Sequence, residues 1–310
     1  MEISEKVKRN RIDFLKIWPL TEQFPCEKYF ENRLKNMGDI PVFHPVTFQY
    51  SIDNKVHTVI SYVIEALDCL PHKPDNAFDW FWKAFEYCIS NQNSQNLTLS
   101  LQNYASDLLS TPNNGVSNGS KSLLKLTKEI PFQTCEYLFK KLATDGFFAP
   151  LPTGVIGKRT LLKNGNPPIV YPNLQSIINH LVTTYTINDH QSVRNAAAFI
   201  RRIIRQEEVD VSGIKIKLSD TEIHMLLVCT LTYTFRNDRT HAELFAPFRS
   251  STATLTTYAH CWFMTMLAHC LLLTIVEHAI PDAKLDLIIE ANTDANIAAY
   301  RKLFGDYRNK

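Results

Sequence analysis

The chain has 310 residues, of which 45% are hydrophobic and 21% charged, and its formal net charge at pH 7 is +2. This length and apolar fraction suffice for one large core or two smaller ones. Only 9 glycines are present, whereas average usage would give roughly 22. The shortage disfavours strand-rich folds with many tight turns. The sequence contains no G-x-G-x-x-G and no G-x-x-x-x-G-K-[ST] motif, so dinucleotide-binding and P-loop folds have no support.

Net charge and cysteine spacing limit which binding partners and which cellular compartment fit the sequence. With a pI of about 8.1 the chain is only mildly basic, so any nucleic-acid surface has to be local. The seven cysteines form no C-x-x-C pair and lie in apolar segments, which favours reduced thiols over disulfides or zinc. The N-terminal sequence MEISEKVKRNRIDF has no apolar signal core. We therefore expect a cytoplasmic protein.

The first half of the chain is predicted to be helical after an irregular start. Residues 18–50 are rich in proline and aromatic residues and show no clear period. The composition of Ser110–Ser122 predicts a surface loop. Apolar residues at helical spacing predict helices over Asn54–Leu70 (ended by Pro71), Asn76–Ile89, Leu123–Lys128 and Phe132–Ala143.

The second half continues the helical pattern with two interruptions. Pro150–Pro172 is predicted to be a long loop or a small hairpin, and the alternation in Val209–Leu218 predicts a short β-hairpin. Ser219 and Glu222 form a capping-box signature, which opens an apolar helix that is expected to stop at Arg236. Further helices are predicted over Asn173–Tyr185, Asp189–Arg205 and Thr252–Ala279.

One segment, Cys261–Val276, is apolar enough to suggest a membrane. It is shorter than the roughly 20 residues that a span needs. It also includes His269 and is followed by Glu277 and His278. These features favour a buried core helix, and no membrane association is expected.

The richest stretch in ionisable groups is Phe235–Ser251, between two strongly apolar helices. Arginine binds phosphate oxygens at two points, and histidine exchanges protons near neutral pH. His241 lies five residues after Arg236, close enough for both to face one pocket. No metal-ligand spacing accompanies them, and we expect no metal and no cofactor. The polar residues of the stretch are Arg236, Asn237, Asp238, Arg239, His241, Glu243 and Arg249.

The string RNDRTH resembles the R-N-x-x-x-H motif of the HEPN superfamily, a group of α-helical proteins that includes many metal-independent ribonucleases. The motif ends one apolar helix and precedes another, as in HEPN proteins. The aromatic-rich segment FDWFWKAFEYC at Phe78–Cys88 looks like the early helix of such domains. The resemblance covers about Asn54–Asn91 and Leu218–Pro281.

The predicted fold is all-α: the resemblance implies a HEPN-like helical bundle, and the pattern along the chain adds a middle insertion and one short β-hairpin. The expected divisions are an N-terminal irregular or helical extension (1–50), a helical domain (51–281) with an insertion at about 93–217, and a C-terminal helical tail (282–310). The implied activity is metal-independent endoribonuclease cleavage by attack of a 2′-hydroxyl on the adjacent phosphate. The implied setting is a toxin or anti-phage defence effector.

The resemblance also implies roles for single residues. Arg236 would bind the scissile phosphate, His241 would act as general base or acid, and Asn237 would orient them. The implied partners are RNA, a second copy of the chain in a homodimer, and an antitoxin or defence-system partner. Residues expected to give local support are Asp238, Arg239, Glu243 and Arg249.

Other interpretations of the same residues stay open. The motif also fits a catalytically silent HEPN-type module for dimerisation or nucleic-acid binding, or a helical scaffold in which Arg236 caps a helix and His241 binds backbone carbonyls. Arg194, Arg201 and Arg205 fall on one helical face. They are predicted to be either an RNA-binding stripe or a solvated helix face.

Overall fold

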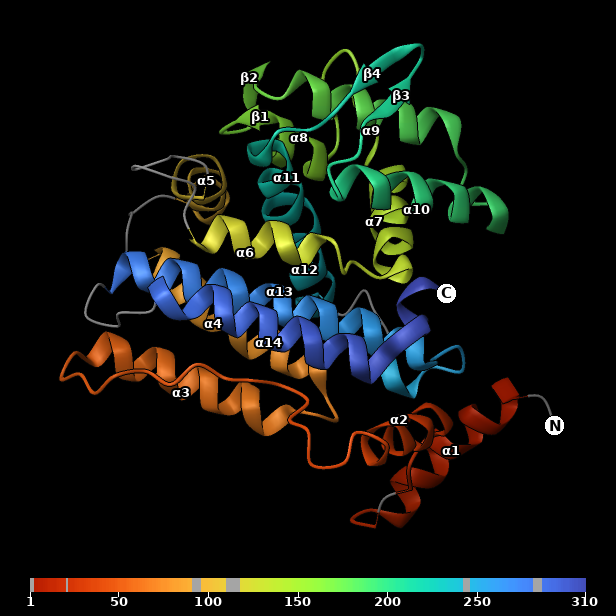
Figure 1. The fold of residues 1–310 in the computed structure, drawn as a ribbon. Coiled ribbons are helices and arrows are strands. Elements are labelled where there is room, and N and C mark those ends of the chain that lie inside the picture. Colours follow the sequence, from red (N-terminus) through yellow and green to blue (C-terminus); the bar gives the residue numbers. More distant parts are fainter. Residues whose placement is uncertain (1–2, 21, 91–95, 110–117, 242–245, 281–285) are drawn as a thin grey trace.

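The longest apolar stretch of the sequence forms helix α13 (Leu255–Ala279), which runs through the middle of the molecule (Figure 1). The computed structural model describes the whole chain except residues 1–2, 21, 91–95, 110–117, 242–245 and 281–285. Helices dominate the described residues, and the only strands in them form two short antiparallel hairpins. The predicted all-α class is confirmed.

Helix α13 has no polar face, and every residue from Thr257 to Val276 is buried. By length and composition α13 could cross a membrane, but its most apolar window is 100% buried inside the fold. Packing against other helices therefore accounts for its composition, and the prediction of a core helix is confirmed. The helices around it include α4 (Pro74–Ser90), α6 (Asn118–Thr127) and α14 (Asp286–Phe304).

Helix α4 packs between α13 and α3 (Asn54–Cys69). It begins with Pro74, whose fixed φ suits a first turn, and the side chain of Asp53 caps α3 by accepting from Lys55 N–H at 2.8 Å. The α4 side chains of Phe78, Phe81 and Phe85 are fully buried. Aromatic burial therefore dominates this part of the core.

The N-terminal extension contributes α1 (Ile3–Ile17) and α2 (Pro25–Lys35). The ring of Phe30 in α2 stacks on Tyr258 of α13, with centroids 4.0 Å apart. The ring of Phe248 also stacks on Tyr258, with centroids 3.9 Å apart. These rings attach the extension to the first turns of α13.

The middle of the chain forms the upper part of the molecule in Figure 1, above the layer of α13, α4 and α14. The hairpin predicted at Val209–Leu218 is confirmed, with Asp210 opposite Lys215. Within Pro150–Pro172 the structure has both a short helix and a small hairpin. The elements are α5 (Leu97–Asn103), a π-helical turn η1 (Tyr104–Leu108), α7 (Phe132–Asp145), α8 (Val155–Leu161), β1 (Leu162–Lys163), β2 (Asn166–Ile169), α9 (Pro172–Thr184), α10 (His190–Ile204), β3 (Val209–Val211) and β4 (Ile214–Ile216), and the chain closes with a 3-10 segment, η5 (Gly305–Asn309).

The predicted loop at Ser110–Ser122 needs correction. Residues 110–117 lie outside the described part, but α6 already begins at Asn118. Gly119 permits this start, because a Cβ there would lie 2.3 Å from Thr274 on α13. The turn-forming composition therefore continues into a helix at Asn118, and α13 leaves room only for glycine at position 119.

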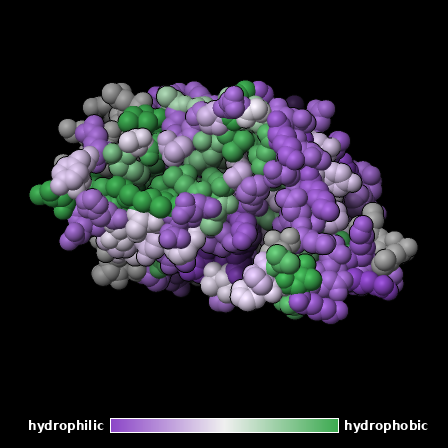
Figure 2. Space-filling view, turned by 90° about the horizontal axis from the view of Figure 1, so that it is seen from below, coloured by the Kyte–Doolittle hydropathy of each residue, from purple (hydrophilic) through white to green (hydrophobic). Residues whose placement is uncertain are grey.

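Seen from below, apolar side chains gather over the side of the molecule on which α3 lies (Figure 2). The outer side of α3 exposes Ile64, which is 52% accessible, and the preceding segment exposes Ile52. A smaller apolar cluster lies at the end where α1 and α2 lie, and Trp18 and Leu20, in the segment between these two helices, are exposed. Contiguous exposed apolar patches of this kind mark contact surfaces.

Candidate functional site

The RNDRTH motif lies at the end of one long helical run that begins at the predicted capping box. Ser219 Oγ and the Glu222 carboxylate cap each other's backbone N–H groups, as predicted. The run consists of α11 (Asp220–Met225), a π-helical segment η2 (Leu226–Thr232) and α12 (Tyr233–Thr240). It does not stop at Arg236 as predicted, because α12 continues for another turn.

The π-helical segment is fixed by buried side chains of α8. Arg159, 5% exposed, donates through Nε to the Cys229 carbonyl at 2.5 Å and through Nη2 to Thr234 Oγ1 at 2.8 Å. Burial lowers the pKa of Arg159. A π turn leaves carbonyls without their usual α-helical partner. Arg159 donates to one such carbonyl and also binds Thr234, near the start of α12.

Arg236 lies in α12 and is partly open to solvent, with 25% of its side chain exposed. Its Nη2 lies 3.2 Å from Glu86 Oε2 on α4, and its Nη1 donates to Asn237 Oδ1 at 3.1 Å. Glu86 also accepts from the indole N–H of Trp82 at 2.8 Å. The guanidinium is therefore orientated by two acceptors but retains an open edge.

His241 ends α12, and its side chain is exposed. Its backbone N–H donates to the Asn237 carbonyl at 2.9 Å. Five residues of helix separate Arg236 and His241 by about 7.5 Å along the axis and about 140° around it. No hydrogen bond, ion pair or ring contact joins their side chains in the described part of the chain. Within one chain, the two groups are near neighbours on different faces of the helix.

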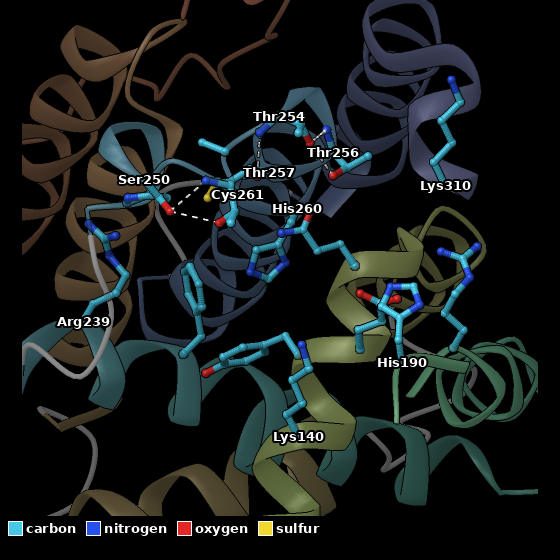
Figure 3. A pocket seen from close by; sticks show the side chains of 18 residues that line it. Lys140, His190, Arg239, Ser250, Thr254, Thr256, Thr257, His260, Cys261 and Lys310 are labelled. Atoms are coloured by element: carbon cyan, nitrogen blue, oxygen red, sulfur yellow. Dashed lines mark hydrogen bonds between the residues drawn. The ribbon is translucent and has the colours of Figure 1, made fainter. Parts of the chain in front are cut away.

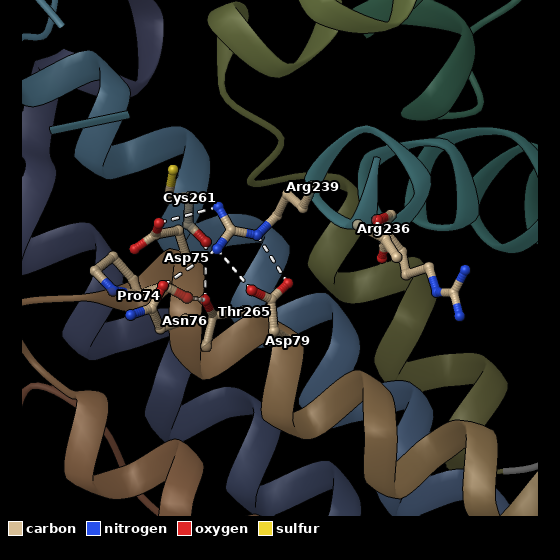
Figure 4. Close-up of polar contacts among 9 residues, drawn as sticks. Pro74, Asp75, Asn76, Asp79, Arg236, Arg239, Cys261 and Thr265 are labelled. Atoms are coloured by element: carbon tan, nitrogen blue, oxygen red, sulfur yellow. Dashed lines mark hydrogen bonds and ion pairs between the residues drawn. The ribbon is translucent and has the colours of Figure 1, made fainter. Parts of the chain in front are cut away.

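Asp238 and Arg239 fix the end of α12 in the body of the protein, and Figure 4 shows the contacts of Arg239. Asp238 is 3% exposed and accepts from Tyr137 Oη at 2.6 Å and Lys141 Nζ at 2.7 Å on α7. Arg239 reaches the first turns of α4, where it lies 3.0 Å from Asp75 and 2.6 Å from Asp79. Figure 4 shows this guanidinium among Asp75, Asn76 and Asp79 at the start of α4, and that of Arg236 pointing away from this cluster, since Arg236 pairs with Glu86 farther along the same helix.

Arg249 and Glu243 were also expected to support the motif. Arg249 is the last residue of the short 3-10 turn η3 (Pro247–Arg249) and pairs with Glu27 of α2 at 3.2 Å, with its guanidinium 4.5 Å from the ring of Phe24. It therefore docks the N-terminal extension. Glu243 lies outside the described residues.

The three arginines predicted as an RNA-binding stripe on α10 are all engaged by neighbours. Arg194 lies over the ring of Phe132 at 4.8 Å, Arg201 donates to Asn309, and Arg205 donates to the Lys128 carbonyl at 2.8 Å. The Nε atoms of Arg201 and Arg205 are buried. This arrangement favours structural roles for those two and leaves Arg194 the most available of the three.

Sequence reasoning did not find the acidic partners of the motif. Asp75 and Asp79 are spaced to share one face of α4, and that spacing was the available signal. Nothing local indicated that Glu86 would meet Arg236, 150 residues away in sequence. Among the described residues, no group of three or more His, Cys, Asp or Glu side chains could hold a metal ion.

No family model, no curated protein and no solved structure matches this chain.

Proposed function

We propose that this protein is a HEPN-type, metal-independent endoribonuclease. The observation that supports it best is the contrast within the motif. Asp238 and Arg239 are fixed in the body, while Arg236 and Asn237 are half-buried and His241 is exposed. A rigid helix end that presents an arginine and a histidine is suited to bind a phosphate and move a proton beside it.

The proposed chemistry follows from these groups. His241 takes the proton of a ribose 2′-hydroxyl as O2′ attacks the adjacent phosphorus. Arg236 stabilises the negative charge that develops on the phosphate oxygens, and Asn237 orients the guanidinium through the contact at 3.1 Å. The bond from phosphorus to O5′ breaks, and O5′ takes a proton from water, while His241 later releases the proton of the 2′-hydroxyl to solvent. The products are a 2′,3′-cyclic phosphate and a 5′-hydroxyl.

A homodimer would supply the missing proximity between the two groups. Arg236 and His241 of one chain lie on different faces of α12, about 140° apart around the axis. Two copies that meet at their α12 ends would place the arginine of one beside the histidine of the other. The toxin or defence setting, with an antitoxin or defence-system partner, is proposed from the motif resemblance alone. The cytoplasmic location agrees with the seven free cysteines.

The first test is cleavage in EDTA of an RNA and of a DNA with the same sequence. We expect only the RNA to be cut, since only RNA has the 2′-hydroxyl nucleophile, with a 2′,3′-cyclic phosphate at the new end. His241→Ala and Arg236→Ala should each reduce the rate by about 10²-fold or more.

Matched controls separate this result from a general loss of structure. Arg202→Ala and His278→Ala remove an exposed arginine and an exposed histidine elsewhere on the surface, and both should cleave at the wild-type rate. Circular dichroism checks that all four variants fold. DNA cleavage, or equal activity of the His241 variant and wild type, contradicts the proposal.

The shared cleft predicts complementation between two inactive variants. A mixture of Arg236→Ala and His241→Ala proteins should form heterodimers in which one arginine and one histidine remain on different chains. We expect cleavage to recover to about a quarter to a half of wild type after subunit exchange, measured on the same RNA. Sedimentation equilibrium gives the dimer fraction. A dimer that shows no recovery would mean that each site lies within one chain.

The ion pair between Arg236 and Glu86 favours a second candidate, a silent module that binds RNA or a partner. In that case the guanidinium is permanently occupied and does not engage a phosphate in catalysis. RNA binding by electrophoretic mobility shift, without cleavage under any of the conditions above, would support the module over the enzyme.

A further inference from the structure

A cavity of about 780 Å³ lies beside α12 and is distinct from the exposed end of the motif. Its walls come from α7, the start of α10, the turn at η3 and the first turns of α13 (Figure 3). Neither Arg236 nor His241 is among its lining residues. The volume is that of a pocket for a small molecule.

The rim of the cavity has an excess of basic side chains. Lys140, Arg194 and Lys310 line it together with His190, and Glu136 is the only acidic side chain among the described lining residues. In the part of the chain that the structure describes, none of these basic side chains forms an ion pair with a carboxylate. A concave surface with unneutralised positive charge attracts anions.

Hydroxyl groups and a helix end add to this anionic preference. Ser250, Thr252, Thr254 and Thr256 line the cavity where α13 begins, and Thr254 accepts from Thr256 N–H at 3.2 Å as the helix cap. A helix of 25 residues directs the positive end of its dipole to this point. Hydroxyls and a helix N-terminus are typical partners of phosphate oxygens.

A buried histidine indicates that a ligand with hydrogen-bonding edges completes the site. His260 is 7% exposed, with its Nδ1 2.8 Å from Thr134 Oγ1. Figure 3 shows its ring pointing into the cavity.

The floor beneath these groups is aromatic. Phe235 lies 5.2 Å from the His260 ring in an edge-to-face arrangement, and Tyr137 lies 5.5 Å from it. Because Phe235 is only 2% exposed, the surface against which a flat ring of a ligand can pack comes from Tyr137 and His260. The site therefore combines an anion-binding rim with an aromatic floor.

We propose that this cavity binds a nucleotide, with its phosphates at the rim that Lys140 and Thr256 line and its base against Tyr137 and His260. His260 then hydrogen-bonds to the base or ribose. The ligand is either a free nucleotide or the 5′-phosphorylated end of an RNA, since both present the same chemistry. Phe235 belongs to the motif helix α12, so binding bears directly on the position of Arg236. The proposal does not depend on ribonuclease activity.

The test is isothermal titration calorimetry of the full chain with ATP, adenosine and tripolyphosphate in separate experiments. ATP should bind with a stoichiometry of one per chain and at least tenfold more tightly than adenosine or tripolyphosphate, because only ATP uses both rim and floor. Lys140→Glu should weaken ATP binding at least tenfold. The matched control Lys217→Glu makes the same charge change on an exposed lysine outside the cavity and should leave binding unchanged.

A second arm distinguishes the two sources of the ligand. A 2′-O-methyl tetranucleotide, which lacks the nucleophile for cleavage, is titrated with and without a 5′-phosphate in competition with ATP. Competition only by the phosphorylated form identifies an RNA end, and no competition by either identifies a free nucleotide. Equal effects of Lys140→Glu and Lys217→Glu, or binding of ATP no tighter than adenosine, would overturn the proposal.

Discussion

Replacing Arg239 by leucine is expected to lower the free energy of unfolding by about 3–5 kcal/mol. The guanidinium lies 3.0 Å from Asp75 and 2.6 Å from Asp79, and only 13% of the Arg239 side chain is exposed. Burial raises the pKa of Asp75, and the charge of Arg239 opposes that rise. Without Arg239, the carboxylate of Asp75 is left buried with no compensating charge, and this loss dominates the expected effect.

Urea denaturation followed by circular dichroism measures the change, and two variants test its cause. Arg202→Leu removes an arginine from the exposed pair with Glu207, 3.2 Å apart, and should cost less than about 1 kcal/mol. Adding Asp75→Asn and Asp79→Asn to Arg239→Leu should recover part of the loss, because the buried charges are removed together with their partner. A decrease of less than about 1 kcal/mol in the free energy of unfolding of Arg239→Leu would contradict a stabilising role for the buried ion pairs of Arg239.

The contacts of Arg239 and Asp238 also position the proposed catalytic residues, so the activity could be lost without loss of a reacting group. Arg239 and Asp238 attach the end of α12 to α4 and α7, respectively. For the proposed ribonuclease activity, Arg239→Leu should therefore reduce RNA cleavage even though Arg236 and His241 are intact. Loss of positioning of this kind costs rate through misplacement of the reacting groups.

Local sequence patterns were sufficient for the elements that depend on neighbours in the chain. The Ser219–Glu222 capping box, the hairpin at Val209–Leu218 and the core helix ending at Ala279 all formed as predicted. In each case the determining contacts span a few residues or arise from a continuous apolar run. The sequence also identified the motif residues as one group, because they are close neighbours in the chain at the end of α12.

Contacts between distant segments could not be predicted in the same way. The helix was expected to end at Arg236, yet it continues to Thr240 because Asp238 and Arg239 find partners on α7 and α4. The partner Asp75 is 164 residues from Arg239 in sequence. Tertiary pairing of this kind overrides the local preference of a polar segment to leave the helix.

The stability of the protein is expected to fall steeply as the pH falls from 7 to 5. Burial lowers the pKa of His224 and His260 to about 4 and that of His269 to about 3, against an ordinary value of 6.5. Below pH 6.5 the unfolded chain therefore binds protons that the folded protein does not, and folding loses stability until the pH reaches the folded values. The three histidines together should remove about 5 kcal/mol between pH 7 and pH 5.

His269 allows this expectation to be tested with one substitution. Its ring packs between Phe43 and Phe81, with centroids 5.0 and 4.9 Å away, so leucine fits its apolar surroundings and does not titrate. His269→Leu should reduce the loss between pH 7 and pH 5 by about a third, to roughly 3.5 kcal/mol, in urea denaturation at both pH values. The control His278→Leu changes an exposed histidine on the same helix and should keep the full loss. An unchanged pH dependence in the His269 variant would mean that this ring gains its proton while the protein is still folded, in conflict with its complete burial among aromatic side chains.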